Sequence, residues 1–481
     1  MNFVKPMIST YLFLKLPSPR LSGALSAAAA TLLVSGCASN FNGPYQAPAL
    51  TLPAQYSQAS ASTVSGAAPA ASGMSWWTRF NDPALDRLVA EVLLRNNNLA
   101  AAAIRVRRAQ LLAGLADNNL QPRFSGSIGT GTSLPLQAGA VSTPSSSLSL
   151  SAAYEIDLWN RLGSLRDVAR WEALASEQDR QSAALSLVGT TAALYWQVGF
   201  LNQRLAANAE SIAYAQTTFD LVQAQYRAGA VSGLEVAEAQ QTLASQLANQ
   251  AVLQQLVVEA RTALALLFDG SASPNLTNPT KLPVLALPLV DAGVPAALLG
   301  RRPDLRAAEL RLRGSFTGID ATRASYYPAF SLTGNLGSSS AQLASVLQNP
   351  AATLGLGVTL PFLQRTAMQL SIRVSETQYE EAVVNFRQTL YTALGDVENA
   401  LSSRQQLAQQ GARLEETLQA ARTAERLYEI RYRAGAVTLS LWLDAQEKRR
   451  TADIALATNR LARLNNQVTV YKALGGDAAV R

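Results

Sequence analysis

The sequence predicts an α+β protein built from two copies of one structural unit, each with two β-strands and a long helical hairpin. The hexapeptide YRAGAV occurs at residues 226–231 and again at 432–437, an offset of 206 residues that also maps Arg105 onto Arg311. Matches held in one register across two halves indicate an internal duplication. Alternation of apolar and polar residues predicts the strands, and apolar residues spaced by seven predict the helices.

The composition argues against several classes of function. The chain of 481 residues has no histidine and one cysteine, which removes histidine acid–base catalysis, most zinc sites and any internal disulfide. Its net charge of +7 includes Lys5, Lys15 and Arg20 of the N-terminal leader, and no long Lys/Arg tract follows. We therefore expect no nucleic-acid partner, no catalytic site and no metal site.

Residues 1–36 predict a signal peptide. A basic region precedes a short apolar run, LSGALSAAAATLLVSGC, that ends in small residues at Cys37. The closing LVSGC resembles the lipobox of bacterial lipoproteins, which implies covalent diacylglycerol and an N-acyl lipid (palmitate) on Cys37. Ala38, where an aspartate would favour the inner membrane, indicates the outer membrane. The alternative is an ordinary signal peptide with a buried cysteine.

The mature chain divides where its composition changes. Residues 37–75 are rich in Ser, Ala, Pro and Gly and predict an extended, lipid-anchored strap. Residues 76–268 form the first structural repeat, 269–300 a Pro/Gly-rich linker, 301–475 the second repeat, and 476–481 a C-terminal tail.

A helix is predicted to open each repeat. Asp82 is a suitable N-cap and Pro83 fits the first helical position. This helix is predicted to continue to about Leu120, because Pro122 disfavours helix at the residue before it. Pro303, within LLGRRPDLRAAE, marks the corresponding start in the second repeat.

Two strands follow in each repeat. Segment 147–158 alternates without a break between apolar and polar residues, and 123–133 is its weaker partner. Segments 330–337 and 354–362 repeat the pattern. Four strands cannot close a membrane barrel, whose smallest form has about eight, and open sheet edges are not tolerated in lipid. The strands are therefore either soluble or pooled by several chains, and three copies would supply twelve.

Long helical hairpins complete the repeats. An apolar residue recurs every seven positions in each rod: Val198, Leu205, Ile212, Phe219 and Tyr226 in the first, and Leu407, Leu414, Ala421 and Tyr428 in the second. Residues 164–226 predict one rod of roughly 90 Å. Gly229 and Gly435 can take positive φ and end the rods. No run of eighteen apolar residues follows the leader, so we expect no transmembrane helix.

Several motifs occur together in one order: WWTRFNDPALDRLV with NNNLAAA, YEIDLW before a long helix, LLGRRPDLRAAE, and two YRAG turns with AQ downstream. With these motifs the chain resembles, over nearly its whole length, the TolC-like outer-membrane factors of tripartite efflux systems, in the lipoprotein (NodT-type) branch. The resemblance implies a homotrimer in the outer membrane of a Gram-negative bacterium. Four strands per chain would form a twelve-stranded β-barrel, continued into the periplasm by a long α-helical barrel.

The resemblance also implies a function and partners. The protein would be a passive exit duct, and no enzyme, for drugs or other small toxic solutes, and would contribute to multidrug resistance. A periplasmic adaptor protein and an inner-membrane efflux transporter, which we expect to be of the RND type, would deliver the solutes. No cofactor is implied apart from the lipid on Cys37.

The same resemblance implies the site residues. Asp444 matches a ring of aspartates that narrows the periplasmic gate, and Tyr432 matches a tyrosine that helps to hold it shut. Leu441, with Leu439 and Trp442, is a candidate for closure by packing. A solvated surface aspartate and a coiled-coil core aromatic are the alternatives for the two matched residues. The residues that match the adaptor-docking tip are Gly229, Ala230, Val231, Gly435, Ala436 and Val437. The alternative is that the two glycines only terminate helices.

Three other functions make different demands on the sequence. A structural coiled-coil envelope lipoprotein without a pore predicts heptads throughout and does not need alternating strands. A general diffusion porin needs many strands and few long helices. A periplasmic enzyme needs a catalytic constellation, and we find no motif for one.

Overall fold

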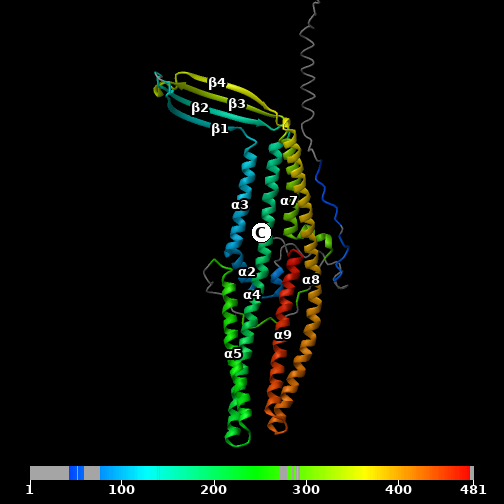
Figure 1. The fold of residues 1–481 in the computed structure, drawn as a ribbon. Coiled ribbons are helices and arrows are strands. Elements are labelled where there is room, and N and C mark those ends of the chain that lie inside the picture. Colours follow the sequence, from blue (N-terminus) through cyan, green and yellow to red (C-terminus); the bar gives the residue numbers. More distant parts are fainter. Residues whose placement is uncertain are drawn as a thin grey trace, which may run out of the picture. The chain divides into compact units, whose positions relative to one another are not determined.

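The computed structural model describes residues 43–50, 52–58, 76–137, 139, 141–269, 279–283, 287–288, 290 and 293–476 (Figure 1). The chain divides into two compact units. We call Ala116–Arg166 with Thr317–Ser375 the sheet unit. The helical unit consists of Ala47–Leu115, Asp167–Phe316 and Glu376–Arg481.

The sheet unit contains one antiparallel sheet with the strand order β1-β2-β3-β4. The strands are β1 (Arg123–Ser133), β2 (Thr143–Ile156), β3 (Ala329–Ser340) and β4 (Pro350–Thr359). All four predicted strands are therefore confirmed. The central β2–β3 pairing joins the two repeats, so the duplicated halves build one sheet rather than two.

The two faces of this sheet differ in chemistry, because side chains alternate between faces along each strand. One face carries apolar side chains that remain exposed, such as Ile128 at 78% and Leu354 at 81%. On the other face, hydroxyl pairs link β1 to β2: Ser125 to Ser151 at 2.6 Å and Ser127 to Ser149 at 2.9 Å. Among the described residues of the sheet unit, no other element covers the exposed apolar face.

The helices of the second repeat reproduce those of the first at the same offset of 206 residues, which confirms the internal duplication. The corresponding pairs are α3 (Asn97–Asn118) with α7 (Pro303–Ala324), α4 (Arg161–Arg227) with α8 (Arg365–Arg433), and α5 (Gly233–Ala265) with α9 (Leu439–Ala473). In Figure 1, α4 runs beside α5 and α8 beside α9, and each pair ends in a tight turn. The shorter helices are α2 (Pro83–Arg95), α6 (Leu298–Arg301), and the 3₁₀ helices η2 (Trp76–Phe80), η3 (Pro295–Ala297), η4 (Leu343–Ser345) and η5 (Pro361–Leu363).

The prediction of one helix from Pro83 to about Leu120 is wrong, because the chain breaks at Asn96. Asn96 has extended backbone angles (φ −76°, ψ 121°) and separates α2 from α3. Its side-chain oxygen accepts a hydrogen bond from the Leu99 N–H at 3.0 Å. An asparagine in this position satisfies the first free N–H groups of a new helix, which favours two helices over one. The predicted N-cap is confirmed, since Asp82 accepts from Ala84 N–H at 3.0 Å.

The predicted heptad stripe on α4 is one side of the buried seam: Val198 is buried, and Leu205, Ile212 and Phe219 are half-buried. Leu201, Asn208, Ala215 and Val222 are buried and are also spaced by seven. This more deeply buried row lies three positions further along the helix than the predicted stripe, in which only the last residue, Tyr226, is exposed, at 52%. Buried Asn208 donates to the Gln246 carbonyl at 3.2 Å, so a polar residue occupies a seam position that a search for apolar residues misses.

A short segment near the N-terminus docks on the helical unit. Tyr56 is buried in its core, and burial raises the pKa of this phenol to about 12. The backbone N–H groups of Ser57 and Gln58 donate to the Glu398 carboxylate at 2.6 and 3.1 Å. This part of the predicted strap is thus held by both packing and charge-assisted hydrogen bonds.

The expected absence of any helix suited to a membrane does not hold strictly. Among the described residues, α4 is long enough and contains a sufficiently apolar window to cross a membrane by length and composition. However, 61% of this window is buried inside the chain. Such burial is what a core helix of a helical bundle shows, so the window is weak evidence for a membrane span.

Candidate functional site at the hairpin tips

The two YRAGAV turns close the hairpins with the same backbone geometry. Gly229 and Gly435 have φ of +74° and +71°, the left-handed region that glycine enters at little cost. In the first turn, the Ala230 N–H donates to the Gln225 carbonyl and the Gly229 N–H to the Tyr226 carbonyl, both at 2.9 Å. This pair of bonds is a Schellman motif, and the second turn has it too. The glycines therefore end the rods as predicted.

The helices that follow the turns begin differently. Ser232 caps α5 with a full capping box, in which its side chain accepts from Leu234 N–H and Glu235 accepts from the Ser232 N–H at 3.0 Å. Thr438 caps α9 without any side-chain hydrogen bond. The start of α9 in the second hairpin is therefore held by fewer hydrogen bonds than the start of α5 in the first.

Tyr432 joins the two hairpins near their tips. Its hydroxyl donates to Gln225 Oε1 on α4 at 3.0 Å, and its ring stacks on Trp442 with centroids 5.0 Å apart. Trp442 and Leu439 are both buried in a small cluster with Val222. Burial, followed by the charge of Glu235, raises the pKa of Tyr432, so the hydroxyl remains a donor at neutral pH.

Asp444 and Leu441 lie on an exposed face of α9, away from that cluster. Leu441 is 46% exposed, whereas its neighbours Leu439 and Trp442 are buried. The Asp444 carboxylate binds the ammonium group of Lys448, one turn later, at 2.6 Å. This hydrogen bond raises the pKa of Lys448. The predicted gate residues therefore fall into two groups within one chain, with Tyr432 inside the inter-hairpin cluster and Asp444 with Leu441 facing out.

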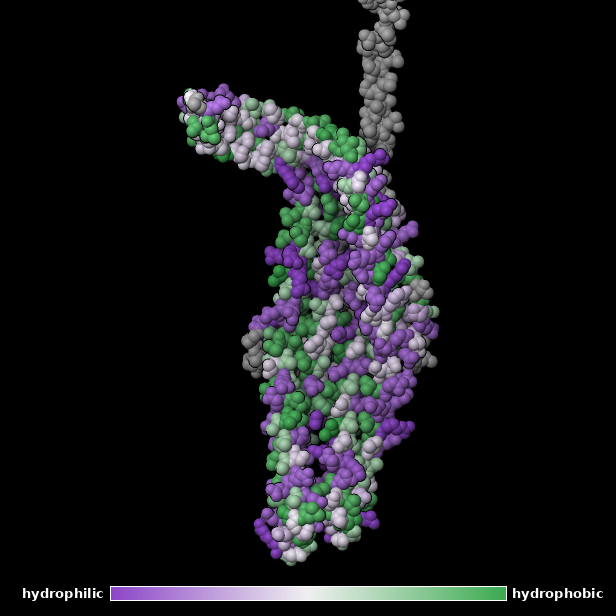
Figure 2. Space-filling view, viewed as in Figure 1, coloured by the Kyte–Doolittle hydropathy of each residue, from purple (hydrophilic) through white to green (hydrophobic). Residues whose placement is uncertain are grey.

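The residues predicted to dock the adaptor form the exposed ends of the hairpins. Gly229, Ala230, Gly435 and Ala436 are exposed, and no other atom crowds the space where a Cβ of either glycine would stand. Val231 and Val437 are half-buried. In Figure 2, white and green surface lies at both hairpin ends, beside purple hydrophilic residues.

Two partners at the tips were missed by the sequence reasoning. Gln225 receives the Tyr432 hydroxyl, and no sequence signal connects residues in different repeats at this spacing. Lys448 follows Asp444 by four positions, which is a recognisable helical ion-pair spacing and could have been predicted.

Other predicted features of a site lie elsewhere or have no counterpart. Cys37 and Ala38 fall outside the described residues, so the lipid anchor stays a prediction. Within the described ranges, no group of three or more Cys, Asp or Glu residues is arranged to hold a metal ion.

Comparison with known proteins identifies the family. The model for "Outer membrane efflux protein" matches residues 88–269 and 294–476, one match for each repeat. The chain belongs to the outer membrane efflux protein family. The resemblance inferred from the motifs is thereby confirmed.

Individual members of this family match over most of the chain. The pyoverdine export outer membrane protein OpmQ of Pseudomonas putida is 33% identical, covering 83% of this chain and 87% of the relative. The antibiotic efflux pump outer membrane protein ArpC of Pseudomonas putida is 31% identical, covering 94% and 95%. The solved structure of the outer-membrane channel OprN is 27% identical with a TM-score of 0.79, covering 91% of this chain and 99% of OprN.

This outer membrane efflux protein is an efflux channel of the outer membrane. Its fold class is also confirmed, since two duplicated repeats supply four strands to one sheet and carry long helices, as in the matched channels. Members of the family are transport channels rather than enzymes. The spacer lipoprotein and the diffusion porin do not fit this membership.

Proposed function

We propose that this outer membrane efflux protein is the exit duct of a tripartite pump and works as a homotrimer. The observation that carries the assembly is the sheet, which has an exposed apolar face, a hydroxyl-bearing face, and edge strands β1 and β4 paired on one side only. A sheet in lipid must close because unpaired backbone groups are costly there. Three chains with four strands each give twelve, which exceeds the minimum of about eight.

The proposed cargo is drugs or other small toxic solutes, which leave chemically unchanged. An inner-membrane transporter of the RND type would deliver them through a periplasmic adaptor. Support comes from relatives named for antibiotic efflux and pyoverdine export. The adaptor would bind the exposed turns around Gly229 and Gly435, and the acyl chains on Cys37 would anchor the assembly in the outer membrane.

The periplasmic gate is proposed at the same end. In a trimer, three copies of Asp444 and Leu441 would meet around the axis, because both are exposed on one face of α9. Tyr432 would act differently, by holding the second hairpin against the first through Gln225.

Two measurements test the proposal. Tagged protein is cross-linked in intact cells and purified, and the proteins that accompany it are identified; we expect an adaptor and an inner-membrane transporter. In parallel, deletion of the gene should raise the accumulation of a fluorescent pump substrate as much as deletion of that transporter does. Recovery of envelope structural proteins alone, with unchanged accumulation, would contradict the proposed role as the exit duct of a tripartite pump.

A further inference from the structure

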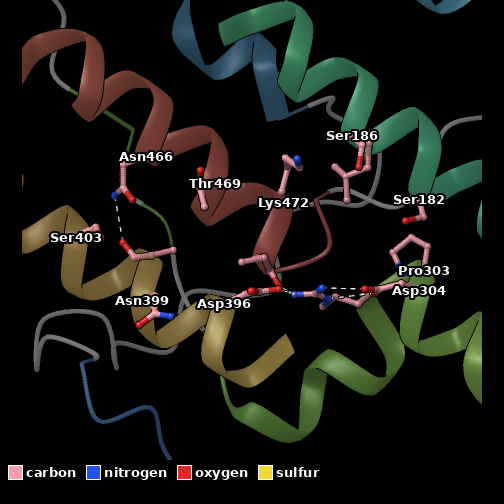
Figure 3. A pocket seen from close by; sticks show the side chains of 14 residues that line it. Ser182, Ser186, Pro303, Asp304, Asp396, Asn399, Ser403, Asn466, Thr469 and Lys472 are labelled. Atoms are coloured by element: carbon pink, nitrogen blue, oxygen red, sulfur yellow. Dashed lines mark hydrogen bonds and ion pairs between the residues drawn. The ribbon is translucent and has the colours of Figure 1, made fainter. Parts of the chain in front are cut away.

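The helical unit contains a polar pocket, and none of the residues that line it belongs to the hairpin tips. It has a volume of about 460 Å³ and is lined by Arg302, which precedes α7, and by residues of α4, α7, α8 and α9 (Figure 3). This volume is within the range of about 300–1,000 Å³ that is typical of small-molecule sites. Hydroxyl and amide groups, including Ser182, Ser403, Asn399 and Asn466, make up much of the lining.

One end of the pocket is acidic. The Arg302 guanidinium lies between two carboxylates, at 2.8 Å from Asp304 Oδ2 and 3.2 Å from Asp396 Oδ2. Burial opposes the charge of Asp304, but hydrogen bonds and the charge of Arg302 outweigh it and lower the pKa of Asp304, which is therefore ionised at neutral pH. One guanidinium between two carboxylates leaves a net charge of −1, and Asp396 is 47% exposed.

The other end of the pocket is basic. No carboxylate of the described residues lies within ion-pair distance of the Lys472 ammonium group. The stem of Lys472 rests on α4 at Gly189, where an added Cβ would stand 2.7 Å from Lys472 Cδ. Ser182 and Ser186 of the same helix line the pocket nearby (Figure 3). An ammonium group with adjacent hydroxyls is a suitable partner for a carboxylate.

The four charged residues therefore sum to zero but are separated across the pocket. A ligand with one charge would satisfy one end and face repulsion or an unpaired charge at the other. We infer that this pocket binds a small zwitterionic solute, with its carboxylate at Lys472 and its ammonium group at Asp396. The site is distinct from the gate and the adaptor-docking turns, and its occupancy requires no pump.

Binding to the purified full-length protein in lipid nanodiscs tests this inference. The probes are the ω-amino acids β-alanine, γ-aminobutyrate and ε-aminocaproate, measured by titration calorimetry against butyrate and butylamine. We expect saturable binding of one ω-amino acid per chain, about tenfold tighter than either singly charged probe, because each end adds a charge-assisted hydrogen bond. Equal affinity for butylamine or butyrate, or no saturable binding of any ω-amino acid, would overturn the inference.

Variants assign the two ends of the ligand. Lys472→Gln should reduce γ-aminobutyrate affinity about tenfold while butylamine affinity stays unchanged. Gly189→Ala keeps the charge but displaces the lysine stem, and should weaken the same probe. Arg413→Gln, on an 80% exposed side chain of α8, is the control and should have no effect. Unchanged binding by Lys472→Gln would contradict the placement of the ligand carboxylate at Lys472. Failure to recover pump partners in the cross-linking experiment would contradict only the proposed exit duct.

Discussion

Tyr226 and Tyr432 occupy the same position in identical hexapeptides, yet their surroundings differ. Tyr432 stacks on Trp442 and donates to Gln225, while Tyr226 is 52% exposed. The difference arises because Tyr432 faces α4 of the other hairpin, whereas Tyr226 lies on an exposed face of α4. Identity of sequence at a duplicated turn therefore does not give identity of role.

Substituting each tyrosine by phenylalanine tests this difference. Tyr432→Phe keeps the ring stacking but removes a hydrogen bond between hairpins, so we expect about 1 kcal/mol less stability at the second tip. Amide hydrogen exchange in residues 428–445 should become faster. Tyr226→Phe is the control and should leave exchange at both tips unchanged. Equal effects of the two substitutions would show that the hydroxyl of Tyr432 does not join the hairpins.

The tip glycines give a second prediction. Gly435→Ala places a Cβ at φ +71°, which costs about 1 kcal/mol because left-handed backbone disfavours side chains. Exchange of the Ala436 N–H, which donates to the Arg431 carbonyl, should be faster. Gly233→Ala, within the first turn of α5, meets open space and should not accelerate exchange. If Gly435→Ala leaves the exchange rate of the Ala436 N–H unaltered, the stability of the turn does not depend on a glycine at this left-handed position.

At the scale of elements, the capping box of α5 predicts a dependence on pH. The hydrogen bond from Ser232 lowers the pKa of Glu235, so the folded-state pKa lies below the unfolded value. The capping contribution is therefore present above about pH 4.5 and is lost as pH falls through the lower, folded-state pKa. Hydrogen exchange in the first turn of α5, corrected for the intrinsic rate, should show this loss.

The first turn of α9 is the natural control for that experiment. Thr438 forms no side-chain cap and Leu441 takes the place of Glu235, so its protection should not change in the same pH range. The variant Glu235→Gln should make α5 equally insensitive to pH. A pH response in both helices would trace the effect to something other than the capping box.

The sequence predicted elements better than their contacts. Strands, rods and turns were predictable because alternation, heptad spacing and paired glycines are local signals. The break at Asn96 was missed because the apolar pattern continues across it, and an asparagine within NNN gives no unique cap position. The seam through Asn208 was missed because its polar residue is satisfied by Gln246 of another helix, which a single helix does not reveal. The proposed arrangement of Asp444 around a pore was not testable in one chain, because it depends on other chains.

At the scale of the whole molecule, we expect substitutions on the two faces of the sheet to have different effects in the membrane. Leu354 and Thr353 are neighbours on β4 and point to opposite faces. Leu354→Lys should place a charge in lipid and cost about 2–4 kcal/mol near the bilayer centre. The amount of the proposed trimer, measured by chemical cross-linking in outer-membrane fractions, should decrease accordingly.

The control for this experiment is Thr353→Lys, which points to the hydroxyl-bearing face and should leave the amount of trimer unchanged. Equal loss from both substitutions would contradict the assignment of the apolar face to lipid. Loss from Thr353→Lys alone would reverse the assignment.

The duplication limits the number of equivalent sites that the hairpin ends of this channel offer to a partner protein. Three chains with two hairpins each would present a ring of six ends that alternate between two kinds, one with a capping box and one without. The ring would look sixfold in outline but is only threefold in detail. A partner present in six copies would have to adopt two alternating poses, whereas a partner in three copies could select one kind of end and ignore the other.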